Sequence, residues 1–358
     1  MIPIVKPFLP PKDKLMSELE KVLYSGYIAQ GSKVEEFERQ LSDYFETDKL
    51  LTLNSGTAAL HLALLLSGVK PDDEVISTPV TAEPTNTTIA LCGAKVVFAD
   101  VEESSGLISP KSIKEKITDR TKAIVVVHYA GMVADMESIY DIAHESNIVV
   151  IEDCAHALGA KYKNRKLGYF SDFAVYSFQA IKHLTTIDGG LLIAGNQADV
   201  ARAKRLRWFG LDKSVSREEN NIIEAGYKYH MNDVNATIGL CQLDCYNENV
   251  LKYIENGRYF DSAISNPKIT IPIPNKWTES SYWLYTLLVD DVSDFNKYLF
   301  SHGIASSQLH KRNDSHDLFQ SSNIQPGVDS FYERFTHIGC GPWVEKDRER
   351  IAKIINNY

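Results

Sequence analysis

One lysine of this sequence stands where its amine could do chemistry. Lys182 lies in a polar turn between two apolar, β-rich runs, 173–178 and 191–194, and the turn continues through Thr185, Thr186 and a pair of glycines. A lysine in a partly apolar pocket has a lowered pKa, so its neutral amine can attack a carbonyl group and form a Schiff base. An isolated lysine is far more often an exposed surface residue, so its neighbours have to support the chemical interpretation.

Two further segments supply that support. The apolar run 149–151 predicts a buried parallel strand, and it ends in Glu152 and Asp153, where open α/β sheets bind ligands. Residues 54–57 (NSGT) join a predicted strand, 50–53, to a predicted helix, 57–67, so backbone N–H groups there can bind an anion. Pyridoxal 5'-phosphate (PLP) requires a Schiff-base lysine, an acid beside its ring nitrogen and a phosphate cradle. Lys182, Asp153 and this turn can provide all three.

Six motifs then show a resemblance to a known family. They are GYIAQG (26–31), NSGTAAL (54–60), DEVI (73–76), EDCAH (152–156), SFQAIKHLTT (177–186) and GYKYHMND (226–233). In this order, over about residues 12–243, the chain resembles the DegT/DnrJ/EryC1/StrS family of PLP-dependent nucleotide-sugar aminotransferases. The resemblance implies the fold of fold-type-I PLP-dependent transferases. It also implies transfer of an amino group from glutamate to a nucleotide-linked keto-(6-deoxy)sugar.

The pattern along the chain predicts the same α/β class. Short apolar strands alternate with helices from residue 49 to about 194, which is typical of a mostly parallel sheet with helices on both faces. The strict alternation is lost after residue 247. We therefore predict a large PLP-binding domain at 12–246, and a smaller C-terminal α/β domain at 247–358 together with residues 1–11.

The resemblance assigns roles to individual residues. Lys182 and Asp153 are the expected catalytic residues, since the lysine holds the cofactor and moves a proton while the aspartate keeps the ring nitrogen protonated. The expected cofactor-binding residues are Ser55, Gly56, Thr57, Asp153, His156, Ser177, Lys182 and, from the neighbouring subunit of a homodimer, Lys228. Three of these have plain structural alternatives: His156 and Ser177 could be satisfied by backbone groups, and Lys228 could equally be an exposed loop lysine.

Substrate residues are expected at two places. The resemblance brings Tyr27 and Gln30 near the substrate, and it places the nucleotide-sugar site near His310, Lys311 and Arg312. Loop packing and a solvated loop explain the two sets about as well from the sequence alone. The nucleotide, the sugar and the carbon that is aminated are not specified by the sequence.

Two positions depart from the family pattern. At the position of Lys228 the family has an asparagine that reaches the cofactor phosphate, although an ammonium group also suits phosphate. Ala82 stands where many members have an aromatic residue that stacks on the cofactor ring, and Tyr129 is a candidate substitute. Stacking contributes only about 0.5–1.5 kcal/mol beyond burial, so alanine does not argue against PLP.

Composition excludes several other classes. The chain has 358 residues, a net charge of −9 and 44% hydrophobic residues, so it can bury a large core and is not expected to bind nucleic acid or an anionic membrane. A cytoplasmic location is expected, because we find no leader or membrane-spanning run. Its five cysteines fit a reducing compartment. Cys241 and Cys245 have a metal-binding spacing but no matching ligand pair, so no metal is predicted.

Three alternatives to the aminotransferase remain at this point. A sugar dehydratase of the same family would carry histidine in place of Lys182. His183 is the next residue, so only a shift of one position in the motif would allow this alternative. A non-catalytic protein that binds PLP or sugar and regulates transcription would need a DNA-binding segment, and none is recognised. A nicotinamide-dependent oxidoreductase would need a Gly-x-Gly-x-x-Gly turn after its first strand, which the sequence lacks.

Overall fold

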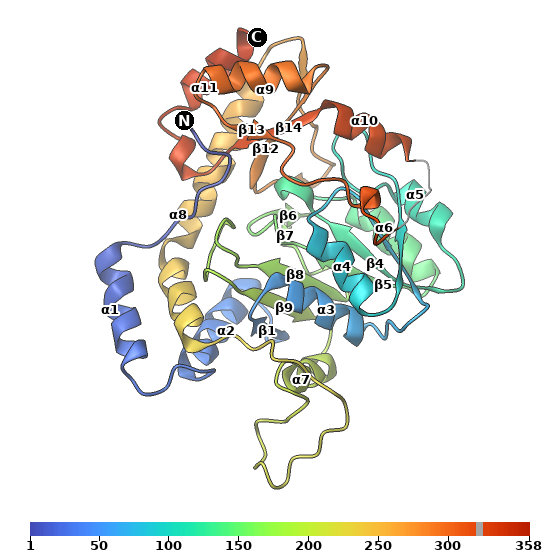
Figure 1. The fold of residues 1–358 in the computed structure, drawn as a ribbon, viewed down its shortest axis with the longest axis vertical. Helices are drawn as coiled ribbons and strands as arrows, with labels where there is room; N and C mark the ends of the chain where they lie inside the picture. Colours follow the sequence, from blue (N-terminus) through green and yellow to red (C-terminus); the bar gives the residue numbers. More distant parts are fainter. Residues whose placement is uncertain (320–324) are drawn as a thin grey trace.

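A computed structural model describes residues 1–319 and 325–358 of the chain. Within these residues, a seven-stranded sheet has the order β1-β9-β8-β5-β4-β2-β3 (Figure 1). Its strands are β1 (Leu50–Leu53), β2 (Glu74–Ser77), β3 (Lys95–Phe98), β4 (Thr121–Val127), β5 (Val149–Asp153), β8 (Phe173–Ser177) and β9 (Gly190–Ala194). The strands from β3 to β8 pair in parallel, whereas β9 is antiparallel to both β8 and β1. The predicted α/β fold with a mostly parallel sheet is confirmed.

Helices cover both faces of this sheet. One face packs against α2 (Ser32–Phe45), α5 (Pro110–Lys116), α6 (Met136–Glu145) and α8 (Asp233–Ala263). The other packs against α3 (Gly56–Leu66), α4 (Glu83–Leu91) and α7 (Gln197–Leu206). Successive strand residues alternate between the two cores, as Val150 and Ile151 of β5 do, because side chains of a strand point to opposite faces in turn.

A second sheet forms the core of the C-terminal part. Its antiparallel order is β10-β12-β14-β13, with β10 (Ile269–Thr270), β12 (Leu284–Val289), β13 (Ser306–Ser307) and β14 (Phe335–Gly339). α9 (Val292–Ser301), α11 (Arg348–Asn356) and the end of α8 pack on it. The remaining helices are α1 (Lys12–Leu23), α10 (Pro326–Arg334), η1 (Tyr129–Gly131), η2 (Asn313–Ser315) and η3 (Pro342–Val344). A small third sheet joins β11 (Thr278–Glu279), β6 (Lys161–Tyr162) and β7 (Arg165–Lys166).

α8 runs without a break from the large sheet to the small one (Figure 1). The predicted domain boundary at 246–247 therefore falls inside a continuous helix. At Gly257 the ring of Tyr282 occupies the space where a side chain would stand, so this glycine allows close packing within α8. The N-terminal residues lie on the small sheet's side, where Ile2 pairs with Ile304 and the Trp343 indole donates to Pro3 O at 2.9 Å. The domain limits themselves stay a prediction.

Apolar contacts also join the two sheets directly. Val127, Tyr129 and Met132 from the end of β4 and the turn after it share a core with Leu284 and Phe335 of the small sheet and with Trp283, which directly precedes β12. This interdomain core lies beside the carboxyl ends of the large sheet's strands. Among the described residues, no helix is long and apolar enough to cross a membrane. The expected cytoplasmic location stays a prediction.

The start of β9 passes very close to the turn between β1 and α3. A methyl group on Gly190 would lie 2.3 Å from Ser55 O and 2.6 Å from Gly56 N, which are backbone atoms that cannot rotate away. We expect Gly190→Ala to force these two segments apart and to lower the free energy of unfolding by about 1–3 kcal/mol, the usual cost of overpacking. Thermal and urea unfolding would measure the loss.

Gly195→Ala is the matched control at the other end of β9. Its methyl group would meet Asp172 O at 3.3 Å, a contact that a small shift relieves. Equal stability losses in the two variants would show that the close approach at Gly190 does not matter.

Candidate active site

The carboxyl ends of β4, β5 and β8 open onto a cavity of about 360 Å³ beside the first turn of α3. Eight of the residues predicted from the sequence line it: Ser55, Gly56, Thr57, Asp153, His156, Ser177, Lys182 and His310. The parallel strands bring the first seven together, since their carboxyl ends meet at one edge of the sheet. His310 reaches the cavity from the loop after β13.

Lys182 lies in the turn that joins β8 to β9. Two backbone hydrogen bonds close this turn, from Phe178 N to Gly189 O at 2.8 Å and from Thr186 N to Phe178 O at 2.9 Å. Burial lowers the pKa of Lys182 from 10.5 to about 7, although the Asp153 carboxylate acts in the opposite direction. Roughly half of these amines are then neutral at pH 7, as a nucleophile requires.

Asp153 is buried at the end of β5. Its Oδ2 accepts a hydrogen bond from Thr85 Oγ1 at 2.8 Å and its Oδ1 accepts one from Ala155 N at 3.0 Å, so both donors are uncharged. Burial raises the pKa of Asp153, and these hydrogen bonds and the charge of Lys182 oppose the rise. A buried carboxylate held in this way would be stabilised by a cationic N–H group in the cavity.

The first turn of α3 offers N–H groups to an anion. Ser55 is the N-cap, and its Oγ accepts from Ala58 N at 3.0 Å. Gly56 and Thr57 line the cavity, and backbone N–H groups of a first helical turn have no partner within the helix. Ser177 lies directly beside Gly56, where a methyl group would stand 3.0 Å from Ser177 Cβ. The turn and Ser177 therefore form one small polar corner of the cavity.

Trp283 also lines the cavity, and no sequence motif indicated it. Its indole N–H donates to Ile181 O at 2.9 Å, and the Lys182 amine lies 4.0 Å from the ring centroid. The His156 ring stacks on Trp283 at 3.8 Å with an angle of 19° between the planes. Burial lowers the pKa of His156 well below 6.5, so this ring is neutral. One tryptophan thus holds the turn of Lys182 and the ring of His156.

Trp283 gave no signal in the sequence, since it stands within an apolar strand pattern far from the other motifs. Ala82 does line the cavity, as expected for its position. Tyr129 is not one of the lining residues, because it is buried behind them, with its hydroxyl donating to Gln308 O at 3.4 Å. The structure therefore gives no support to Tyr129 as a ring-stacking substitute.

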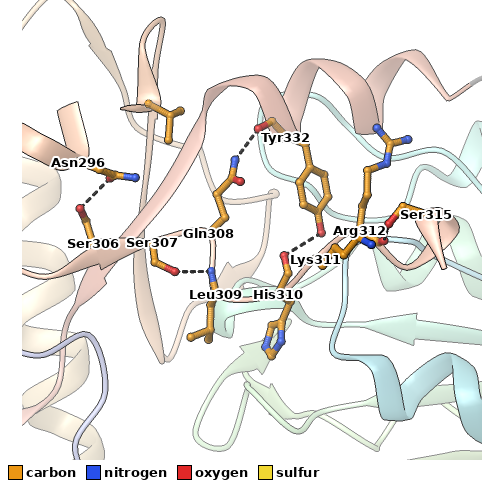
Figure 2. A pocket seen from close by; sticks show the side chains of 11 residues that line it. Asn296, Ser306, Ser307, Gln308, Leu309, His310, Lys311, Arg312, Ser315 and Tyr332 are labelled. Atoms are coloured by element: carbon orange, nitrogen blue, oxygen red, sulfur yellow. Dashed lines mark hydrogen bonds between the residues drawn. The ribbon is translucent and has the colours of Figure 1, made fainter. Parts of the chain in front are cut away.

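The other predicted residues lie outside this cavity in the single chain. Lys228 is exposed, although its carbonyl accepts from Asn54 Nδ2 at 3.1 Å beside the α3 turn. Tyr27 is exposed, and Gln30 accepts from Lys213 Nζ at 3.0 Å. Lys311 and Arg312 line a second, more open cavity of about 620 Å³ on the C-terminal side (Figure 2).

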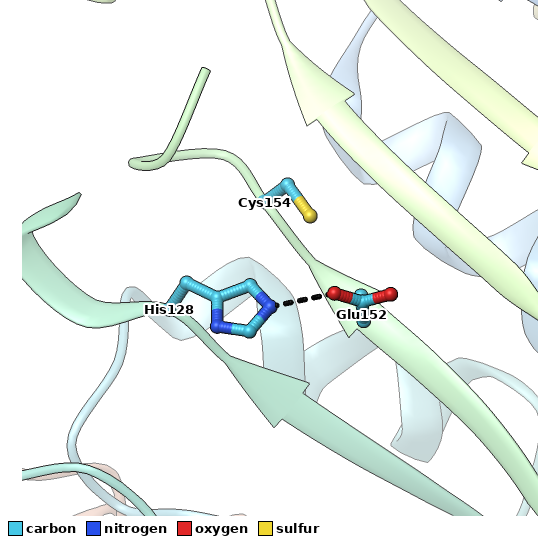
Figure 3. A group of neighbouring side chains, drawn as sticks. All are labelled: His128, Glu152 and Cys154. Carbon is cyan, nitrogen blue, oxygen red and sulfur yellow. Dashed lines mark hydrogen bonds and ion pairs between the residues drawn. The ribbon is translucent and has the colours of Figure 1, made fainter. Parts of the chain in front are cut away.

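Figure 3 shows a buried group of possible metal ligands, His128, Glu152 and Cys154. Hydrogen bonds account for its polar atoms. His128 Nε2 lies 2.9 Å from Glu152 Oε2, His128 Nδ1 accepts from Ala134 N at 3.2 Å, and Glu152 Oε1 accepts from Gly168 N at 3.0 Å. With both imidazole nitrogens engaged, the group ties the ends of β4 and β5 together rather than offering a metal site.

Comparison with known proteins agrees with this geometry. A model of the DegT/DnrJ/EryC1/StrS aminotransferase family matches residues 11–356. UDP-4-amino-4-deoxy-L-arabinose–oxoglutarate aminotransferase from Shewanella sediminis is 37% identical over 271 residues, which are 74% of this chain and 69% of the relative. The sugar aminotransferase CalS13 from Micromonospora echinospora is 31% identical, with all of both chains covered and a TM-score of 0.95. The PLP form of Spr1654 from Streptococcus pneumoniae is 28% identical, with 99% of each chain covered and a TM-score of 0.88.

The interaction between Asp153 and Lys182 predicts how the pKa of Lys182 changes in an Asp153 variant of the cofactor-free protein. Because the Asp153 carboxylate raises the pKa of Lys182, Asp153→Asn should lower it below its value of about 7 in the unchanged protein. The pKa can be measured by labelling the lysines competitively with acetic anhydride over a range of pH and quantifying each peptide by mass spectrometry. Surface lysines in the same digest provide the internal reference. A higher pKa in Asp153→Asn would contradict the proposed interaction.

Proposed function

The chain belongs to the DegT/DnrJ/EryC1/StrS aminotransferase family, and from that premise we propose that it transfers an amino group from glutamate to a keto-sugar carried on a nucleotide. It is a PLP-dependent sugar aminotransferase, as the resemblance in its sequence predicted. What we propose beyond this activity is the identity of its substrates: a keto-(6-deoxy)sugar linked to a nucleotide, and glutamate as the amino donor. The observation that carries the proposal is that Lys182, whose pKa burial lowers to about 7, and the buried Asp153 carboxylate line one cavity beside a helix N-terminus.

The residues of the cavity fit PLP. Among the described residues, the donors to Asp153 are uncharged, which suits the protonated ring nitrogen of the cofactor. Gly56, Thr57 and Ser177 form a polar corner that suits its phosphate, and Lys182 supplies the amine. His156 would lie beside the ring, held by Trp283. When bound, PLP supplies an electron sink for the carbon that loses its proton.

Each of these side chains has a task that follows from its surroundings. Lys182 takes a proton from the reacting carbon and returns it, because an amine with a pKa of about 7 can act as a base and as an acid near neutral pH. Asp153 holds a proton at the ring nitrogen. Trp283 fixes the backbone at Ile181, and the indole and the His156 ring exclude water from one side of the cavity.

The dehydratase alternative is not favoured by the structure. His183 points away from the cavity, with its Nε2 donating to Ser281 O at 3.1 Å and its ring against Tyr253 at 4.5 Å. Lys182 is the residue of this pair that lines the cavity. The position that would need a histidine for dehydration therefore carries an amine.

The proposed function can be tested with a panel of UDP- and dTDP-linked 4-keto-sugars, each incubated with glutamate and PLP. We expect one class of keto-sugar to give a product whose mass corresponds to replacement of the carbonyl oxygen by an amino group. Lys182→Ala should lose this activity and should not retain the cofactor after treatment with borohydride and denaturation, because the amine that binds it covalently is missing. A Lys182→Ala variant with the rate of the unchanged enzyme would refute the role of Lys182.

We also propose that the enzyme is a homodimer with shared active sites. The Lys228 side chain is exposed and does not line the cavity of its own chain, although its backbone lies beside the phosphate corner. Such a lysine could reach the cavity of a second copy in a two-fold dimer, the commonest homo-oligomer.

Complementation tests this assembly. Lys182→Ala and Lys228→Ala should each be inactive alone, and activity should return when the two are denatured and refolded together. In a mixed dimer one site then inherits both defects and the other inherits neither. An inactive mixture, with mixed dimers confirmed by mass spectrometry, would contradict the shared site. A fully active Lys228→Ala variant would remove the role of Lys228 in phosphate binding.

A further inference from the structure

His310 lies in the wall between the two cavities. Among the described residues, it is the one that lines both the cavity of about 360 Å³ and the cavity of about 620 Å³. Its backbone belongs to the loop of the second cavity, where its carbonyl accepts from the Tyr332 hydroxyl at 3.4 Å, and its imidazole points away from Tyr332 (Figure 2). The ring is nearly parallel to that of His156, at 5.7 Å. The imidazole of His310 therefore reaches the reaction site from the C-terminal side.

Glu83 faces this imidazole from the large domain. It is the first residue of α4, follows Ala82 and lines the same cavity as Lys182. Its Oε2 lies 4.0 Å from His310 Nδ1, and its side chain is 45% exposed, whereas that of His310 is 18% exposed. A carboxylate and an imidazole from different domains thus stand at the cavity's mouth.

The facing atoms of Glu83 and His310 are not in direct hydrogen-bond contact. A separation of 4.0 Å is too long for a direct hydrogen bond, but one oxygen atom between the two groups could reach both. His310 Nε2 is buried and has no hydrogen-bond partner in the described part of the chain. Burial also lowers the pKa of His310 to about 4, so the ring is neutral near pH 7 and can donate from one nitrogen and accept at the other.

We propose that Glu83 and His310 are a specificity-determining pair that binds one hydroxyl group of the sugar beside the reacting carbon. The hydroxyl donates to the Glu83 carboxylate and accepts from the imidazole N–H, so it fills the space between them. Hydrogen bonds to a carboxylate are short and strong, and a site built for a hydroxyl discriminates against a substrate that lacks it. The inference rests on the sugar substrate of the proposed function.

The same pair separates the two substrates of the reaction. Glutamate must enter the same cavity to deliver its amino group, but its carboxylates are repelled by Glu83. A neutral, hydroxylated sugar is attracted at this point. Glu83 is therefore expected to act on the sugar half of the reaction and not to assist the amino donor.

Glu83→Gln tests the pair, because it keeps the shape of the side chain and removes its charge. The probe is UDP-4-amino-4-deoxy-L-arabinose with 2-oxoglutarate as acceptor, together with the 2-deoxy and 3-deoxy analogues of the sugar. When two substrates react in turn, kcat/KM for each reports its own half of the reaction. We expect Glu83→Gln to lower kcat/KM for the sugar by about ten- to a hundredfold, as for loss of a hydrogen bond to a charged group, and to leave kcat/KM for 2-oxoglutarate unchanged.

The deoxy analogues identify the hydroxyl. The 3-deoxy analogue should be used about equally well by the unchanged enzyme and by Glu83→Gln, because the hydroxyl beside C4 that distinguishes the two enzymes is missing, whereas the 2-deoxy analogue should preserve the difference. Calorimetric titration of the holoenzyme with the amino sugar should show the same weakening in Kd, which a purely kinetic defect would not produce. Glu83→Asp keeps the charge, so its kcat/KM for the sugar should lie between the values of the unchanged enzyme and of Glu83→Gln.

Three results would overturn the proposal, and they can be distinguished from one another. Equal kcat/KM for an accepted sugar in the unchanged enzyme and Glu83→Gln, or equal losses for the sugar and 2-oxoglutarate, would show that the pair does not select the sugar. If the unchanged enzyme accepts neither this probe nor any nucleotide sugar of the panel, the proposed function fails and the role of the pair fails with it.

Discussion

The charge balance between Lys182 and Asp153 governs the reaction cavity. Both groups are removed from water, and each shifts the pKa of the other toward its charged form while burial shifts it toward the neutral form. In the part of the chain that the structure describes, the hydrogen bonds to the Asp153 carboxylate come from the uncharged groups of Thr85 and Ala155. A cavity with this balance can bind a cofactor that carries a cationic ring nitrogen and an aldehyde, and it can hold the amine ready for proton transfer.

The C-terminal part of the chain contributes to this cavity through rigid contacts. Trp283 reaches Ile181 O, and Asn249 of α8 donates to His183 O at 2.6 Å, so the residues on both sides of Lys182 are fixed from outside the large sheet. Ser281 N in turn donates to Gly131 O at 3.1 Å, which anchors the Trp283 segment on the turn after β4. The position of the reactive amine therefore depends on how the two sheets are joined.

Much of the fold and part of the candidate site could be predicted from the sequence. Strand periodicity and the polar residues at strand ends are local signals, and they located the large sheet, the α3 turn, Asp153 and Lys182. The predicted domain boundary at 246–247 falls inside α8, because the strict alternation of strands and helices is lost after residue 247 while the helix itself continues to Ala263. Trp283 and the pairing of Glu83 with His310 could not be predicted, since both depend on tertiary contacts between segments about 100 or more residues apart. Arg312 illustrates the same limit. A guanidinium group is suited to binding an anion, but the carboxylates that pair with it in the fold could not be predicted from the sequence.

Those partners constrain where a nucleotide's phosphates can be bound. The Arg312 guanidinium donates to both carboxylate oxygens of Asp314, at 2.8 and 2.7 Å, and it also pairs with Asp329, so its charge is already balanced. Lys311 and Lys228 are exposed, and among residues 1–319 and 325–358 neither forms an ion pair within the chain. The hydrophobic side chains of Ile222 and Ile223, in the loop that leads to Lys228, are also exposed at 55% and 75%. Exposed apolar side chains in the same loop as an exposed lysine suit an interface with a second copy better than open solvent, which supports the proposed homodimer in which Lys228 reaches the cavity of the second copy.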